Sequence, residues 1–177
     1  MAELYGEARS GQLGVMPSHT FGTELGPCTI AWEGHEVTGF RLLGSDEASI
    51  PEKDVPDWIQ ALIARVQRHL SGEPQDFADV PFAFSQVSDF QRDLYLAALK
   101  VKAGQTLSYG GLAKAIGQPP AAARAVGTAL GQNPWPLLVP CHRFVGADGA
   151  MTGFSAPGGI KTKLRLLAIE GAQLFAE

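Results

Sequence analysis

The stretch Val139-Pro140-Cys141-His142-Arg143 places a cysteine, an imidazole and a guanidinium side by side behind a proline. Pro140 fixes its own φ at about −65° and disfavours helix at the preceding residue, so we expect Cys141 in an ordered, non-helical turn. The thiolate is the reactive form of cysteine, and cationic or imidazole neighbours increase its share. A lone Cys-His pair is more often a buried structural cysteine beside surface charges, so the flanking sequence has to decide.

Further motifs lie on both sides of this stretch. They are Ser108-Tyr109-Gly110-Gly111-Leu112-Ala113, Arg124-Ala125-Val126-Gly127 and Asn133-Pro134 upstream, and Gly153-Phe154-Ser155 and Glu170-Gly171 downstream. In this order they closely resemble the O6-alkylguanine-DNA alkyltransferases (methylated-DNA–protein-cysteine methyltransferases), whose proline-cysteine-histidine-arginine stretch carries the alkyl-accepting cysteine. The resemblance runs in register from about Phe90 to Gly171. The first 84 residues resemble the family only loosely.

Charge is distributed unevenly along the 177 residues, whose net charge is −4. Residues 1–84 hold 5 Lys and Arg against 13 Asp and Glu, a net of −8, whereas residues 85–177 hold 9 against 5, a net of +4. Such asymmetry hints at a nucleic-acid face on the basic half, although mixed-charge surfaces also vary by chance. We predict a structural N-terminal α/β domain at 1–84 and a DNA-binding, alkyl-accepting domain at 85–177.

The chain shows neither a signal peptide nor an apolar stretch of membrane-spanning length. The two cysteines, Cys28 and Cys141, make no disulfide framework, and a free reactive thiol fits a reducing cytosol. We therefore expect a cytoplasmic protein without a membrane partner. Relatives of the resembled family can carry an N-terminal zinc site. Here Cys28, His19, His35 and His69 lack metal-binding spacing, so we predict no metal.

The N-terminal half is expected to hold a small sheet and one long helix. Residues 28–32 and 37–43 are predicted as strands on either side of a turn, with Cys28 as a small buried hydrophobe, after a loose start over residues 1–18. Asp54 to Ser71 is predicted as an amphipathic helix. Its core positions are Val55, Trp58, Ile59, Leu62, Ile63, Val66 and Leu70. A short strand is predicted at 82–84.

The C-terminal half is expected to be mostly helical, which makes the whole chain α+β. Ser88 and Gln91 form a capping-box pattern before a helix. That helix is predicted to bury Phe90, Leu94, Ala97, Ala98 and Val101. Helices over 109–116 and 121–130, joined by a turn, predict a helix-turn-helix, for which an ordinary helical corner is the alternative. The apolar residues 137–139 are predicted as a buried strand leading to Cys141.

The second of these short helices is unusual for a DNA reader. It is almost bare of polar side chains, whereas a helix in the major groove normally projects them to base edges. The resemblance instead implies that it enters the minor groove and inserts Arg124 where the target base was. From the residues alone, Arg124 is a solvated helix charge. The predicted DNA contacts are Tyr109, Ala123, Arg124, Ala125, Gly127 and Thr128.

The resemblance also implies roles at the reactive site. Cys141, a water molecule, His142 and Glu170 would form a chain, and Tyr109 would donate a proton toward the departing guanine. Asn133 would hold the turn, and Lys163 would support the active-site loop. The substrate pocket is predicted from Val139, Pro140, Phe154 and Ser155.

Three departures from the family pattern leave the range of accepted alkyl groups open. Phe154 replaces a tyrosine of the pocket wall, the loop Ser155-Ala156-Pro157-Gly158-Gly159 is longer than usual, and Phe144 stands where a smaller aliphatic residue is common.

Together these features predict a DNA repair protein that binds double-stranded DNA as a monomer. It would transfer an alkyl group from O6-alkylguanine, with O4-alkylthymine as a further candidate, irreversibly to Cys141, without a cofactor. One alternative is an alkyltransferase-like protein that binds lesions without chemistry, although such proteins lack the cysteine. The other is a cysteine hydrolase, for which no motif supplies an oxyanion site.

Overall fold

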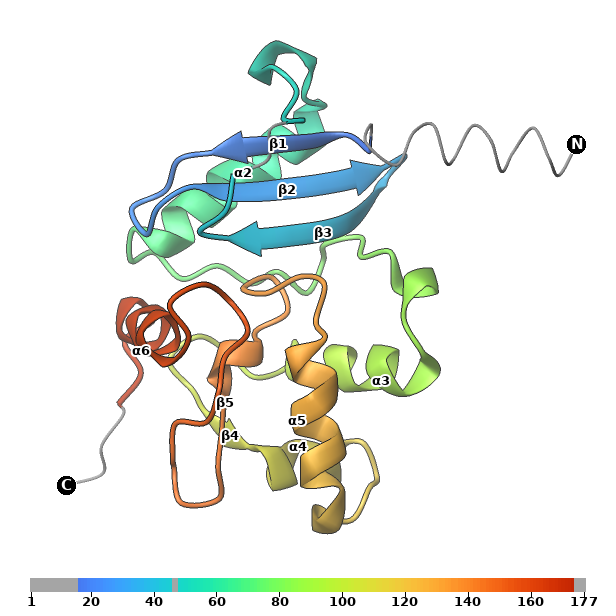
Figure 1. Ribbon diagram of the computed structural model, residues 1–177, viewed down its shortest axis with the longest axis vertical. Coiled ribbons are helices and arrows are strands. Elements are labelled where there is room, and N and C mark those ends of the chain that lie inside the picture. Colours follow the sequence, from blue (N-terminus) through green and yellow to red (C-terminus); the bar gives the residue numbers. More distant parts are fainter. Residues whose placement is uncertain (1–15, 46–47, 174–177) are drawn as a thin grey trace, which may run out of the picture.

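The computed structural model describes residues 16–45 and 48–173. A three-stranded sheet with one long helix, α2 (Asp57–Leu70), across one face forms the N-terminal part, and a mostly helical part lies below it in Figure 1. The predicted α+β class is confirmed. Within the described residues, no helix is both long and apolar enough to cross a membrane.

The sheet is antiparallel throughout, in the order β1-β2-β3. β2 (Cys28–Glu33) and β3 (Glu36–Leu42) confirm the two predicted strands, and Cys28 is fully buried as expected. β1 (Ser18–Phe21) was not predicted. Its buried residues stand at the two ends rather than alternating, so the sequence lacks the period-2 signal of a strand.

Helix α2 spans Asp57–Leu70, three residues later than predicted, after a 3-10 turn at Glu52–Asp54 (η1). Pro56 is the N-cap residue and disfavours helix at the residue before it, which explains the later start. The buried face of the helix consists of Ile59, Leu62, Ile63, Val66, His69 and Leu70.

The two parts share one core rather than meeting at a polar surface. Trp135, from the C-terminal part, is fully buried and donates its indole N–H to the Val37 carbonyl of β3 at 2.9 Å. Its ring packs on Phe82, Phe84 and Tyr95. The strand predicted at 82–84 is wrong. Phe82 makes one isolated bridge to Val37, and Phe84 already opens the 3-10 turn Phe84–Gln86 (η2).

Helix α3 (Asp89–Ala98) begins with the predicted capping box, in which Ser88 and Gln91 each accept a hydrogen bond from the other's backbone N–H. The predicted burial of Phe90 is wrong, since this side chain is 36 % exposed. The first turn extends beyond the core, and full burial begins one turn later at Leu94.

The remaining elements build the lower part of the molecule. They are β4 (Leu107–Ser108), α4 (Tyr109–Ala115), η3 (Pro120–Ala122), α5 (Ala123–Gly131), η4 (Cys141–Arg143), β5 (Phe144–Val145) and α6 (Ile160–Ile169). β4 pairs in parallel with β5 directly after the cysteine turn. The strand predicted at 137–139 is wrong. These residues are buried, but Leu137 has a φ of 78° and Val139 makes one isolated bridge, so the segment turns instead of extending.

Candidate active site

The reactive turn is buried and held from one side by an asparagine. Cys141 is 6 % exposed and opens the 3-10 turn Cys141–Arg143, so the turn is ordered as predicted but has helical character. Asn133 donates its side-chain amide N–H to the Val139 carbonyl at 2.9 Å and accepts from the Trp135 backbone N–H at 2.9 Å. These two bonds fix the approach to the cysteine from both ends of the loop.

The thiol is protonated in this resting arrangement. Burial raises the pKa of Cys141, and hydrogen bonding by Asn133 and the positive charge of Lys163 lower this pKa without cancelling the effect of burial. The sequence-based expectation that neighbouring cations favour the thiolate therefore names one effect correctly but omits burial, which favours the protonated thiol more strongly. A base has to remove the proton before the sulfur can act as a nucleophile.

The neighbouring histidine is held in a tautomer that leaves one ring nitrogen able to accept a proton. His142 Nε2 lies 2.7 Å from Glu170 Oε1, and the imidazole is fully buried. Because the carboxylate accepts a hydrogen bond, Nε2 of a neutral ring carries the hydrogen and Nδ1 keeps its lone pair. Nδ1 has no hydrogen-bond partner among the described residues. It is thus free to accept a proton.

Glu170 holds this arrangement as a buried anion. Burial raises the pKa of its carboxyl, but His142, His69 and Arg143 outweigh burial and hold it far below its usual range. Arg143 donates Nε to Oε2 at 3.0 Å and Nη2 to Oε1 at 2.8 Å, in the bidentate geometry that suits a guanidinium. Burial lowers the pKa of His142 more than Glu170 raises it, so the ring rests neutral.

A cavity of about 620 Å³ lies between α5, the start of α4 and the loop before α6. Its lining residues are Tyr109, Ala123, Arg124, Gly127, Thr128, Gly131, Thr152, Gly153, Phe154 and Ser155. The cavity therefore combines most of the predicted DNA contacts with two predicted pocket residues. Ala125 is exposed on α5 outside this lining, and Val139 and Pro140 are buried in the loop before the cysteine.

Lys163 connects this cavity with the reactive turn. Its side chain is buried, and Nζ donates to the Phe144 carbonyl at 2.6 Å, the Tyr109 hydroxyl at 3.4 Å and the Thr152 carbonyl at 3.5 Å. The Tyr109 hydroxyl is also hydrogen bonded to Thr152 Oγ1 at 2.6 Å. One buried cation thus joins the strand after Cys141 to the cavity wall.

Comparison with known proteins agrees with this arrangement. The family model described as "6-O-methylguanine DNA methyltransferase, DNA binding domain" matches residues 89–172. A methylated-DNA–protein-cysteine methyltransferase of Mycobacterium bovis is 36% identical over 160 residues, which cover 89% of this chain and 94% of the relative. The chain belongs to the methylated-DNA–protein-cysteine methyltransferase family.

A solved structure and a relative with a different name are also similar to this chain. It matches the crystal structure of Mycobacterium tuberculosis OGT in complex with DNA with a TM-score of 0.74 and 36% identity, covering 89% of this chain and 95% of that chain. A Thermus thermophilus protein named DNA base-flipping protein is 39% identical over 152 residues, 85% of this chain and 97% of the relative. The similarity to both extends well beyond the matched DNA-binding domain.

Sequence reasoning missed two partners of Glu170 in this family member. Arg143 stands in the quoted motif, but nothing in the sequence showed that it is buried against the glutamate. His69 Nε2 lies 2.9 Å from Glu170 Oε1 and is buried, although it was considered only as a candidate metal ligand. Its signal was its place on the apolar face of α2, three residues after Val66. Among the described residues, no group of three or more His, Cys, Asp or Glu could hold a metal ion.

Proposed function

We propose that this protein repairs double-stranded DNA by moving the alkyl group of O6-alkylguanine to Cys141, and that each molecule acts once. The observation that carries the proposal is a buried thiol on the same turn as His142, whose ring is hydrogen bonded to the buried Glu170 carboxylate. Lys163 joins the strand after this turn to a cavity walled by a helix of small residues. A DNA repair role also agrees with the family to which the chain belongs.

Activation of the sulfur would begin at His142. Adjacent side chains seldom meet directly, so we propose that a water molecule bridges the thiol and the unpartnered Nδ1. The proton passes through this water to His142, and Glu170 stabilises the imidazolium that forms. The sulfur then attacks the alkyl carbon in line, the C–O6 bond breaks, and a thioether forms at Cys141.

The departing guanine needs a proton or a strong hydrogen bond at the same time. Tyr109 faces the cavity, and we propose that its hydroxyl donates to the base. Lys163 donates to the same oxygen at 3.4 Å and would stabilise the phenolate that remains. Solvent then returns a proton to Tyr109 and takes the extra proton from His142, while the sulfur stays alkylated.

The lesion must leave the duplex to reach this cavity. Extruding a nucleotide costs a few kcal/mol, and less for a damaged pair. We propose that α4 and α5 act as the helix-turn-helix, that α5 enters the minor groove, and that Arg124 fills the vacated stack. Arg124 is exposed at the cavity rim, and the small side chains of α5 permit close approach of the DNA backbone.

The cavity wall would set the range of alkyl groups. Phe154 is half-buried against the core and offers an apolar surface to the lesion, with O4-alkylthymine as a second candidate substrate. The whole site comes from one chain, so we propose that a monomer suffices. The free thiol it needs fits a reducing compartment.

The test is an intact-protein mass measurement after incubation with a duplex that contains O6-methylguanine. We expect one added methylene, located on the peptide that contains Cys141, with Cys28 unmodified. Excess substrate should give a single burst equal to the active protein and no steady rate.

The second candidate function is lesion binding without chemistry, which the relative named DNA base-flipping protein brings forward. Tight binding of the methylated duplex without any mass gain would favour that alternative. Turnover beyond one equivalent, or methylation of Cys28, would contradict Cys141 as a self-consumed acceptor.

A further inference from the structure

We infer that His69, on α2 of the N-terminal part, is a positioning residue for alkyl transfer that holds the Glu170 carboxylate in place for His142. The inference rests on the proposed function and means that the N-terminal part contributes a residue to the active site. His69 lies 101 positions before Glu170 in the sequence, so the contact exists only when the two parts are packed together.

Both ring nitrogens of His69 are committed. The backbone N–H of Gln75 donates to Nδ1 at 2.9 Å, so Nδ1 keeps a lone pair and the hydrogen of the neutral ring lies on Nε2. Nε2 then donates to Glu170 Oε1. The ring is 1 % exposed and packs on Phe77 with the centroids 5.4 Å apart. His69 is therefore a fixed hydrogen-bond donor.

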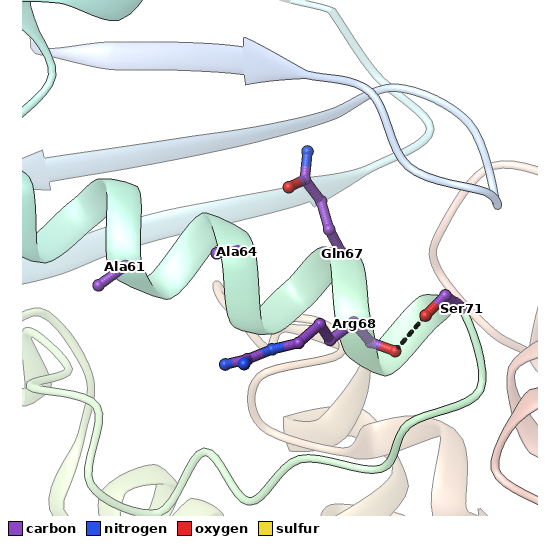
Figure 2. A pocket seen from close by; sticks show the side chains of 5 residues that line it. All are labelled: Ala61, Ala64, Gln67, Arg68 and Ser71. Carbon is purple, nitrogen blue, oxygen red and sulfur yellow. Dashed lines mark hydrogen bonds between the residues drawn. The ribbon is translucent and has the colours of Figure 1, made fainter.

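The end of α2 that carries this donor is itself well ordered by hydrogen bonds. Figure 2 shows Ser71 turned back onto the helix, where its hydroxyl donates to the Arg68 carbonyl at 2.8 Å. The backbone N–H of Glu73 donates to the same carbonyl at 3.0 Å, and that of Gly72 donates to the His69 carbonyl at 3.1 Å. Figure 2 labels the side chains that line an exposed hollow at this end of α2, among them Arg68 and Ser71. His69 is not part of that lining and is buried.

The need for a partner outside the cysteine turn follows from where the other partners stand. His142 and Arg143 both belong to the turn that Glu170 must hold, so any shift of the turn moves them with it. His69 approaches the same oxygen, Oε1, from a separate element. It thereby fixes the carboxylate, and through it His142, against the rest of the protein.

The experiment compares His69→Leu, His69→Gln and the control Ile59→Val in the full-length protein. Leu removes the donor, whereas Gln retains an amide N–H that reaches about as far as Nε2. Ile59 is a fully buried residue of the same helix and serves as a matched packing control. Each variant reacts with methylated duplex and with free O6-methylguanine, which carries the same alkyl group but needs no base flipping.

We expect His69→Leu to slow alkyl transfer about tenfold on both substrates, at the low end of the about 10–100-fold losses known for outer partners of metal-bound ligands. His69→Gln should recover most of the rate, and Ile59→Val should keep the parent rate. Affinity for the duplex should stay unchanged in all three.

The pH dependence supplies a readout that lost packing would not move. His142 is faced by Glu170, Arg143 and His69, and Lys163 acts on the sulfur. If Glu170 drifts in His69→Leu, the pKa of His142 falls, the ring stays neutral to lower pH, and the pH of half-maximal rate moves lower. His69→Gln should restore the parent profile.

A parent rate in His69→Leu would overturn the inference, as would a loss confined to duplex or a loss that Gln does not repair. Failure of the parent protein to methylate Cys141 would instead overturn the proposed function.

Discussion

Replacing Glu170 by glutamine tests whether the charged cluster stabilises the fold as well as the site. The change keeps the shape of the side chain but removes its charge. Arg143 uses Nε and Nη2 on the two carboxylate oxygens, at 3.0 and 2.8 Å. An amide has one acceptor oxygen, so its NH2 group would face an arginine donor. His142 and His69 would lose an anionic acceptor as well.

The size of the effect follows from the burial of the pair. The side chain of Glu170 is 1% exposed and that of Arg143 is 7% exposed. Removing one partner of a buried ion pair costs about 3–5 kcal/mol, because the other charge is left without compensation. For a protein of this length each kcal/mol lowers the Tm by about 2–4 °C, so we expect a fall of about 6–20 °C.

Urea unfolding at neutral pH measures the loss in the free energy of unfolding, with Asp79→Asn as the matched control. Asp79 also pairs with an arginine, Arg65, at 2.8 Å, but its side chain is 71% exposed. Exposed pairs contribute about 0–1 kcal/mol, so this control should change little. Equal effects of the two substitutions would refute the reasoning, because burial would then not decide the energy.

The pH dependence of the free energy of unfolding tests whether the charge of Glu170 causes this stabilisation. The fold lowers the pKa of Glu170, so the charged carboxylate contributes fully to the free energy of unfolding above the ordinary pKa of about 4.3. This contribution is lost progressively as the pH falls from there toward the lowered pKa. A protonated Glu170 is a neutral near-isostere of glutamine. The difference between parent and Glu170→Gln should therefore narrow in acid, and a difference that widens would contradict a charged Glu170 in the fold.

Three further predictions concern binding, flipping and capping. Cys141→Ala should abolish methyl transfer but keep affinity for methylated duplex in a gel-shift titration, and loss of binding by the folded variant would make Cys141 structural. Arg124→Ala should slow reaction with duplex far more than reaction with free O6-methylguanine, and equal slowing would show that Arg124 acts through the fold or the thiol. Ser88→Ala should lower the free energy of unfolding by about 1 kcal/mol, because the Gln91 N–H loses its cap, and urea titration at unchanged m-value checks this.

Local signals predicted the local structure well. The Ser88 pattern gives the start of α3, and the apolar spacing gives α2 apart from the delay that Pro56 imposes. Segments whose shape depends on tertiary contacts were less predictable. The apolar run 137–139 was predicted as a strand, but Asn133 holds the Val139 carbonyl, and Leu137 takes a positive φ that a run of apolar letters does not reveal.

The site shows the same division between local and long-range information. Cys141, His142 and Glu170 could be named from the sequence as candidate site residues because a known pattern carries them. The contact of His69 with Glu170 could not be predicted from the sequence, because the two residues lie in different halves of the chain. The position of His69 three residues after Val66 predicts a buried side chain, and a buried imidazole needs a polar partner. Which partner it finds depends on how α2 packs against the end of α6.

The raised pKa of the thiol fits a protein that can react only once. A standing thiolate would react with any alkylating agent in solution, and each such event would consume a molecule. Burial keeps Cys141 protonated, and the base that can remove the proton is equally buried. On the proposed mechanism, the sulfur becomes a nucleophile only when the lesion fills the cavity and Tyr109 and Lys163 stabilise the departing guanine. Selectivity thus comes from holding the thiol inactive until an extruded base completes the site.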